Sequence, residues 1–254
     1  MTTTRQNGSL HTNIQDNIAT IEFGHPASNS FPSELLERLA KELITISNHA
    51  DVAIIILKSE GKKAFCAGAS FDELVAISNL KDGQQFFAGF ANVLNAMRTC
   101  GKLIIGRVQG KTVGGGVGLI AACDYALATE NAAIKLSEFT IGIGPFVIEP
   151  AVTRKIGVSG TSELTLDATN WKNAYWAKEK GLYAKVFETI NELDKEVEIL
   201  SEKLASYNPI ALTEMKKALW KGTEKWTDLL AERAAISGAL VLSEFTKKAL
   251  EKFR

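Results

Sequence analysis

The strongest constraint on the fold of this chain is a series of short apolar runs that alternate with helical patterns. Val52 to Leu57 and Leu103 to Val108 are nearly continuous apolar runs, which are typical of strands buried on both faces. Ile18 to Phe23 alternates apolar with polar residues and predicts a half-buried strand. Apolar residues recur at helical spacing after Pro32 and from Asp82 to Thr99. Two further short strands are predicted, at Tyr125 to Ala128 and Ile134 to Leu136.

This alternation of strands and helices predicts the α/β class. It ends shortly before residue 190, after which only helical patterns follow, at Asn191 to Tyr207, at Pro209 to Gly222 and from Trp226 onward. We therefore expect a core over residues 1–190 and a helical region over 191–254. The apolar residues of the helical region fit either an internal core or a contact with another subunit, and composition does not decide between them.

The composition argues against several classes of partner. Lys+Arg and Asp+Glu are balanced at 29 each, so no basic surplus favours nucleic acid. No apolar run approaches the ~20 residues of a membrane-spanning helix, and the first residues are polar, unlike a signal peptide. Cys66, Cys100 and Cys123 form no CxxC pair, which favours a reducing, cytoplasmic setting. The three histidines lack metal-ligand spacing, so we expect no metal site.

Three segments carry residues suited to chemistry. Lys62 to Asp72 follows a predicted strand and contains the small residues Ala67, Gly68 and Ala69, which let a ligand approach the backbone. Gly114 to Leu119 is a glycine-rich run that opens a helical stretch and offers N–H groups at the positive end of a helix dipole. Glu138 closes a short strand.

Each segment alone also has a structural explanation: a turn, the tight packing of a helix on a sheet, or a solvated charge. Together they supply what enolate chemistry needs. Two backbone N–H donors stabilise a developing oxyanion, while a carboxylate moves a proton at the neighbouring carbon.

The glycine-rich run also matches a different kind of site. Gly116 to Ala121 fits the dinucleotide-binding pattern GxGxxG/A, and Glu138 lies 17 residues further on (138 − 121), near the place of a ribose-binding acid. This alternative is the weaker one. Gln109 to Val113 separate the motif from the preceding predicted strand, and Ala67 to Ala69 would stay unexplained.

At these residues the sequence resembles the crotonase (enoyl-CoA hydratase/isomerase) superfamily, over nearly the whole chain. Lys63 to Ala69 resembles the family's CoA-binding loop, and Gly114 to Gly116 resembles its second oxyanion motif. Glu138 matches the position of the second catalytic glutamate. The resemblance implies that the N–H groups of Ala69 and Gly115 hold a thioester oxygen, and that Glu138 is the general acid/base.

The resemblance also implies a fold and partners. The fold is a crotonase-type ββα spiral core with a C-terminal helical region that builds a homotrimer or a dimer of trimers. The substrate is an acyl-CoA thioester, so CoA arrives with it and no separate cofactor is expected. Adenine is expected near the carbonyls of Phe65 to Ala67. The residues implied to bind substrate or CoA are Lys62, Lys63, Phe65, Ala67, Gly68, Ser70, Gly114 and Gly118.

Two departures from the family pattern bear on the reaction. Gly118 stands where two-glutamate hydratases carry their first carboxylate, twenty residues before Glu138 (138 − 118), and Pro145 to Pro150 replaces a glycine-rich turn. This combination resembles a subgroup named methylglutaconyl-CoA or enoyl-CoA hydratases, so we expect hydration, and we expect Gly118→Glu to raise its rate. Double-bond isomerisation is the alternative, since one base can shuttle one proton, and a non-catalytic acyl-CoA-binding protein is the third.

Overall fold

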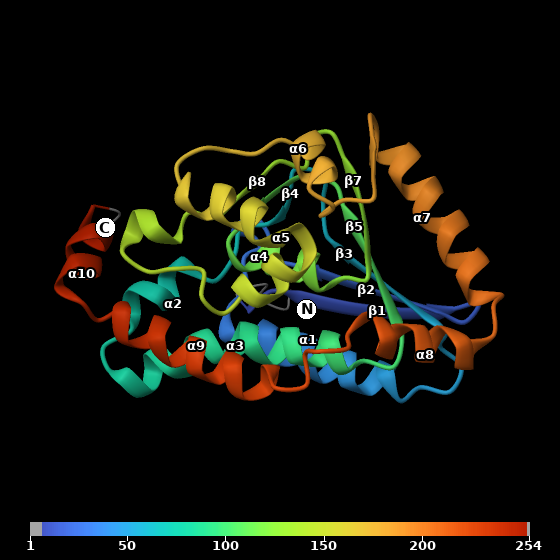
Figure 1. The fold of residues 1–254 in the computed structure, drawn as a ribbon, viewed down its shortest axis with the longest axis horizontal. Coiled ribbons are helices and arrows are strands. Elements are labelled where there is room, and N and C mark those ends of the chain that lie inside the picture. The colour runs from blue at the N-terminus through green and yellow to red at the C-terminus, as the bar shows by residue number, and fades with distance from the viewer. Residues whose placement is uncertain (1–6, 253–254) are drawn as a thin grey trace, which may run out of the picture.

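A six-stranded sheet forms the centre of the molecule (Figure 1). The computed structural model describes residues 7–252. The strand order is β1-β2-β3-β5-β7-β9; β1 and β2 are antiparallel and every other pair is parallel. The sheet confirms the predicted α/β class. Its strands are β1 (Ser9–Gln15), β2 (Ile18–Gly24), β3 (Ile54–Ser59), β5 (Leu103–Val108), β7 (Tyr125–Thr129) and β9 (Lys185–Phe187).

A second, smaller sheet is built from strands that alternate along the chain with strands of the large sheet. It consists of β4 (Ala64–Cys66), β6 (Lys111–Val113) and β8 (Ile134–Lys135), which are parallel and in that order. The chain therefore repeats one unit three times: a strand of the large sheet, a strand of the small sheet, and then a helical segment. Because the repeated strands are parallel, the segments that follow them leave the small sheet at one edge.

The helical segments cover these sheets, and those of the C-terminal quarter follow one another without strands, as predicted after residue 190. The helices are α1 (Ser33–Ser47), α2 (Phe71–Ala76), α3 (Leu80–Thr99), α4 (Gly115–Ala122), the 3₁₀ helix η2 (Glu138–Ile141), α5 (Glu149–Leu166), α6 (Ala174–Glu179), α7 (Ile190–Ala205), α8 (Pro209–Leu219), α9 (Trp226–Leu240) and α10 (Glu244–Glu251).

Strand β3 shows why its sequence is apolar at successive positions. Ile55 and Leu57 belong to the large core, whereas Ile54 and Ile56 belong to a second cluster that includes Leu193 of α7. Both faces of the strand are thus covered by protein, as its continuous apolar run predicted. The strand lies two residues later than the predicted span.

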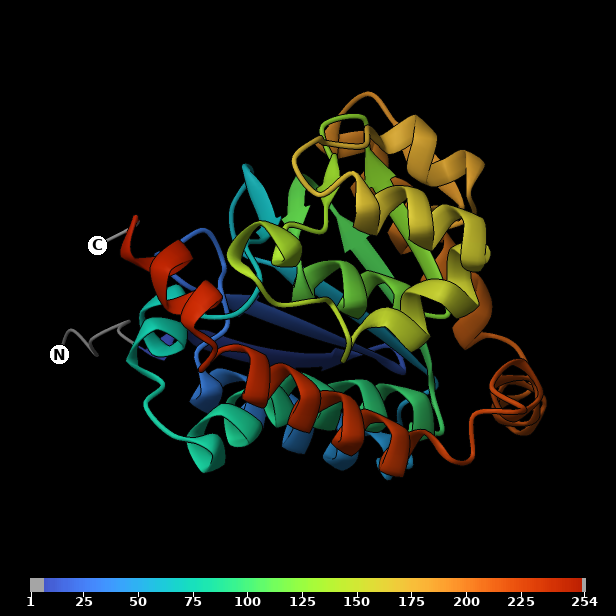
Figure 2. The ribbon, with the colours of Figure 1, turned by 60° about the vertical axis from the view of Figure 1, so that its left-hand side comes forward.

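The C-terminal helices pack onto the core of their own chain. Helix α9 runs alongside α3, and α10 contacts η2 (Figure 2). Trp220 and Leu230 are buried within this single chain, at 6% and 0% exposure, which supports the internal-core alternative for these two residues. No helix among residues 7–252 is long and apolar enough to cross a membrane.

Candidate active site

The three segments that the sequence singled out meet at one edge of the small sheet. Ala69 follows β4, Gly115 follows β6 and Glu138 follows β8. Strand β6 pairs with β4 on one side and with β8 on the other, all in parallel, so the three segments emerge side by side. This arrangement places two backbone turns and one carboxylate around a common space.

The backbone of Ala69 is turned toward that space by a bridge to Phe31. The N–H of Phe31 donates to the carbonyl of Gly68 at 2.8 Å, and the N–H of Ser70 donates to the carbonyl of Phe31 at 2.9 Å. A parallel bridge uses the groups flanking Ala69, so the N–H of Ala69 itself points away from Phe31. Within residues 7–252 it has no hydrogen-bond acceptor.

The second backbone donor is the N–H of Gly115, the first residue of α4. The first N–H groups of a helix have no carbonyl of their own helix to bind, and they lie at the positive end of its dipole. Gly114 precedes the helix with φ 55°, a conformation that favours glycine. The described part of the chain provides no acceptor for the Gly115 N–H.

The two donor turns touch at Gly68. Its φ is +88°, and a Cβ at this position would lie 3.2 Å from the carbonyl oxygen of Val113 and 3.7 Å from the nitrogen of Gly115. Glycine adopts this positive φ without strain, whereas a side chain would be strained there and would press on the carbonyl of Val113. The N–H groups of Ala69 and Gly115 are therefore held in adjacent turns, suited to bind one oxygen atom.

Glu138 brings the carboxylate to the same place. A Cβ at Gly114 would lie 3.0 Å from Oε1 of Glu138, so the carboxylate packs directly against the turn that precedes Gly115. The residue as a whole is half-buried, yet its Oε2 is buried and has no hydrogen-bond partner among the described residues. Burial raises the pKa of Glu138 to about 7, against the opposing effect of backbone N–H groups at Glu138 and Ser137.

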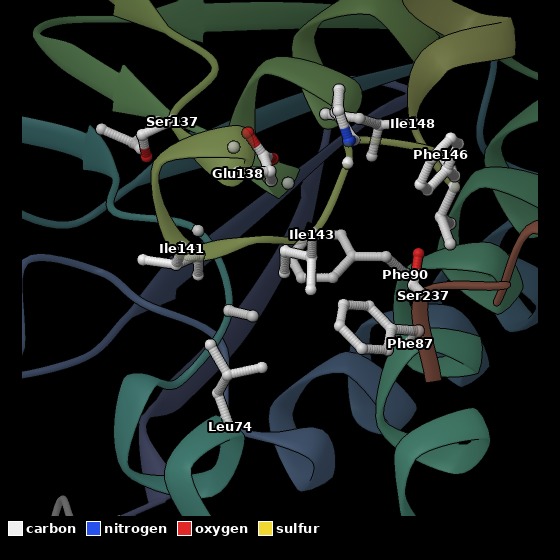
Figure 3. Close-up of a pocket in the computed structure, with 18 of the residues that line it drawn as sticks. Leu74, Phe87, Phe90, Ser137, Glu138, Ile141, Ile143, Phe146, Ile148 and Ser237 are labelled. Carbon is white, nitrogen blue, oxygen red and sulfur yellow. The ribbon is translucent and has the colours of Figure 1, made fainter. Parts of the chain in front are cut away.

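A largely apolar pocket of about 160 Å³ opens in front of these groups (Figure 3). Besides the residues described above, its walls come from α2, α3, the end of η2 and the segment after it, and α9. Those walls include Leu74, Phe86, Phe87, Phe90, Ile141, Ile143, Pro145, Phe146, Val147, Ile148 and Ser237. None of the described lining residues is Lys, Arg or His. The pocket suits an apolar chain whose reactive end lies beside Glu138.

The structure brings together about half of the residues predicted to form the site. Of the predicted residues, those that line the pocket are Ala67, Gly68, Ala69, Gly114, Gly115 and Glu138. Phe65 lies in the core against Phe23, with ring centroids 5.3 Å apart, and Ser70 caps α2 by accepting the N–H of Glu73. Lys62 and Lys63 are exposed and lie outside the pocket lining, so their predicted role in binding CoA phosphates stays a prediction.

Gly118 lies outside the pocket lining, so its predicted role in binding substrate stays a prediction. A Cβ at Gly118 would lie 2.4 Å from Cγ2 of Ile148, which itself lines the pocket. The side chain of Ile148 thus fills the space that a carboxylate at position 118 would need. A glutamate at position 118 therefore requires Ile148 to move or to be made smaller, and the expected effect of Gly118→Glu on hydration stays a prediction.

The sequence did not indicate three side chains that matter here. Phe90 closes the pocket beneath Gly115, where a Cβ at Gly115 would lie 2.3 Å from its ring. Ile148 belongs to the Pro145 to Pro150 stretch, whose departure from the family pattern was its only signal. Ser237 stands in a helix with no clear apolar stripe and carried no signal.

The raised pKa of Glu138 predicts a pH dependence of stability. Its pKa is about 7 in the folded protein against an ordinary 4.5, so the folded state binds this proton more tightly than the unfolded state. The contribution of Glu138 to the free energy of unfolding is therefore most favourable below pH 4.5 and falls as pH rises to 7, by up to about 3 kcal/mol. Glu138→Gln removes this dependence.

Urea denaturation of the wild type and Glu138→Gln at pH 5 and at pH 8 measures the effect. We expect the stability of the Gln variant relative to the wild type to be higher at pH 8 than at pH 5. A difference that stays constant between the two pH values would contradict the raised pKa.

A family model described as enoyl-CoA hydratase/isomerase matches residues 13–252. The chain belongs to the enoyl-CoA hydratase/isomerase family. This confirms the crotonase resemblance, and a solved enoyl-CoA hydratase from Bacillus halodurans shows the same fold. Its TM-score is 0.88 at 23% identity, and the match covers 96% of this chain and 99% of that one.

Relatives in this family have different activities. The chain is 28% identical to a short-chain-enoyl-CoA hydratase from Clostridium acetobutylicum, over 93% of this chain and 90% of the relative. It is 28% identical to a peroxisomal Delta(3,5)-Delta(2,4)-dienoyl-CoA isomerase from Arabidopsis thaliana, over 77% of this chain and 74% of the relative. It is 28% identical to mouse mitochondrial methylglutaconyl-CoA hydratase, over 88% of this chain and 71% of the relative. These similarities support an enzyme of the family without distinguishing a lyase from an isomerase.

Proposed function

We propose that this protein converts an enoyl-CoA thioester with Glu138 as its single acid/base. The observation that carries the proposal is the buried Oε2 of Glu138 beside two backbone N–H groups, none of which has a hydrogen-bond partner among residues 7–252. A thioester oxygen bound by the N–H groups of Ala69 and Gly115 gains negative charge as an enolate forms. Such donors each typically stabilise the transition state by about 2.7–4 kcal/mol.

We propose hydration as the reaction. A water oxygen bonds to C3 while a proton is added at C2, and Glu138 accepts the proton of the water and returns one to the enolate carbon. A carboxyl group with a pKa of about 7 holds both protonation states near neutral pH, which suits a group that gives and takes protons. Relatives that match about nine-tenths of this chain are named as hydratases, which supports this choice.

Double-bond isomerisation is the second candidate, and the packing of Ile148 on Gly118 favours it. That contact gives the pocket an apolar wall where a second carboxylate would orient water. One carboxylate suffices for isomerisation, because the proton removed from one carbon is returned to another.

Turnover of crotonyl-CoA and of a 3-enoyl-CoA ester in ¹⁸O-labelled water separates the two reactions. Hydration incorporates ¹⁸O into a 3-hydroxyacyl product, whereas isomerisation shifts the double bond and incorporates none. Tight binding of both esters without turnover would instead support the non-catalytic acyl-CoA-binding alternative and overturn the enzymatic proposal.

The lining of the pocket bears on the identity of the acyl group. Methylglutaconyl-CoA carries a distal carboxylate, and no cationic side chain lines the pocket among the described residues, so we favour an uncharged acyl group. CoA belongs to the substrate, and the proposal needs no separate cofactor. Assembly as a homotrimer or a dimer of trimers, and a cytoplasmic location, stay predictions from the sequence.

If the N–H of Gly115 binds the thioester oxygen, a substitution that removes this N–H should lower kcat. Any side chain at position 115 meets Phe90, so Gly115→Ala and Gly115→Pro are compared in a Phe90→Ala background. Both variants add a Cβ, but only proline removes the N–H, and the first position of a helix accepts proline. We expect kcat of the Pro variant to be about 10²- to 10³-fold below that of the Ala variant.

Steady-state kinetics on the best enoyl-CoA ester, with circular dichroism as a folding control, test this expectation. Equal kcat values for the two folded variants would remove Gly115 from the oxyanion site.

A further inference from the structure

Ser237 is a polar residue at the far end of the pocket with no role in the chemistry above. Its side chain is 1% exposed and lines the pocket, and its Oγ has no hydrogen-bond partner in the described structure. A buried hydroxyl without a partner costs about 1–3 kcal/mol. Only one other unpartnered buried side-chain atom within residues 7–252 belongs to a pocket-lining residue, Oε2 of Glu138.

A serine inside a helix usually solves this problem locally. In α7, Ser201 is also fully buried, and its Oγ donates to the carbonyl of Val197, four residues earlier, at 2.7 Å. Ser237 makes no such bond to the carbonyl of Arg233. Both serines are buried within helices, but among the described residues only the hydroxyl of Ser201 has a hydrogen-bond partner. The hydroxyl of Ser237 is therefore available to a ligand in the pocket.

The packing of two helices determines the position of Ser237. A Cβ at Gly83 of α3 would lie 2.8 Å from the carbonyl oxygen of Gly238, and a Cβ at Gly238 would lie 2.7 Å from the nitrogen of Gln84. The backbones of α3 and α9 are therefore in direct contact beside Ser237. Figure 3 shows Ser237 on α9 and Glu138 on a different wall of the pocket, which Ile143 and Phe90 also line.

This placement fits the distal part of an acyl chain. With the thioester oxygen at Ala69 and Gly115 and the reacting carbons at Glu138, the rest of the chain extends into the apolar pocket toward α9. A serine hydroxyl donates one hydrogen bond and accepts others, so its complement is a hydroxyl or a carbonyl oxygen. A carboxylate would be desolvated there without a cation among the described lining residues.

We propose that Ser237 is a specificity-determining residue that binds a neutral oxygen, a hydroxyl or carbonyl, carried by the acyl chain beyond its reacting carbons. This inference rests on the proposed function, since it places the thioester and the reacting carbons at the other end of the pocket. It assigns the substrate class as oxygenated enoyl-CoA esters in place of plain or dicarboxylic ones.

The test compares hex-2-enoyl-CoA with its 4-, 5- and 6-hydroxy derivatives and with hex-2-enedioyl-CoA. In the wild type we expect one hydroxy ester to give the highest kcat/KM and the dicarboxylic ester the lowest. Ser237→Ala is expected to lower the ratio of kcat/KM for that hydroxy ester over hex-2-enoyl-CoA by about 3- to 10-fold. Ser201→Ala, which removes a buried helical hydroxyl outside the pocket, is expected to leave the ratio unchanged.

Thermal unfolding supplies a readout that does not depend on turnover. Ser237→Ala removes a hydroxyl without a partner and should keep or raise Tm, whereas Ser201→Ala removes a bonded hydroxyl and should lower it. A Tm loss for Ser237→Ala as large as that for Ser201→Ala would show that the hydroxyl already has a structural partner, and would overturn the inference.

Dissociation constants of the same esters, measured by calorimetry in the Glu138→Gln background, separate this inference from the proposed function. If no ester is turned over by the wild type but Ser237→Ala weakens only the hydroxy ester, the proposed function fails and the inference stands. Turnover with an unchanged ratio, or a dicarboxylic ester as best substrate, overturns the inference alone. Absence of both binding and turnover overturns both.

Discussion

Glu138→Gln should lower kcat by about 10²- to 10⁴-fold while changing KM little. Gln keeps the shape of the side chain and removes its ability to exchange protons. The N–H groups of Ala69 and Gly115 belong to the backbone of other segments, so the substitution leaves these two proposed oxyanion donors in place. The loss therefore falls on proton transfer, which initial-rate kinetics on the best ester will show as a change in kcat.

The pH profile gives the same prediction a second measurement. Because burial raises the pKa of Glu138 to about 7, the wild-type profile of kcat/KM should show a break near pH 7 that is absent in Glu138→Gln. Glu149→Gln is the matched control. This carboxylate begins α5, accepts the hydroxyl of Thr153 at 2.6 Å and does not line the pocket. Near-normal turnover by Glu138→Gln would place the base elsewhere.

Local pattern was enough to predict most of the large sheet and the helical C-terminal region. Strand β5 lies where its apolar run predicted it, and α3 differs from the predicted span only at its first turn. The small sheet was mostly missed, because β4, β6 and β8 have only 3, 3 and 2 residues. Strands this short show no periodicity, and their pairing depends on contacts between distant parts of the chain.

The proposed catalytic residues were predicted from their chemical type and family resemblance, not from these strands. Small residues and a lone carboxylate mark Ala69, Gly115 and Glu138 in the sequence itself. The contacts that shape the pocket leave no such mark. Ile148 fills the space above Gly118, and Ser237 enters from α9, through packing between segments far apart in the chain. The sequence shows that Ile148 and Ser237 are present. Their places in the pocket wall depend on which residues of distant segments they pack against in the folded chain.

The second large effect concerns an ion pair that joins α4 to α8. Asp124, just after α4, and Lys216 of α8 are 2.6 Å apart, with side chains only 5% and 2% exposed. The carboxylate of Asp124 also accepts the backbone N–H of Ile104 at 2.8 Å and the Nε1–H of Trp220 at 2.7 Å. Removing one member of such a pair leaves a buried charge without its partner, which typically costs about 3–5 kcal/mol.

Lys216→Met should therefore lower the free energy of unfolding by about 3–5 kcal/mol. The neighbouring residue supplies the control, because Lys217 is exposed and pairs with Glu214 at the surface. Lys217→Met should change stability by less than about 1 kcal/mol. Urea denaturation of both variants at one protein concentration measures the two effects. Asp124→Asn added to Lys216→Met should recover part of the loss, since the buried carboxylate is then replaced by a neutral amide. Equal losses at positions 216 and 217, or a double variant no more stable than Lys216→Met, would show that burial of the Asp124 charge is not the cause.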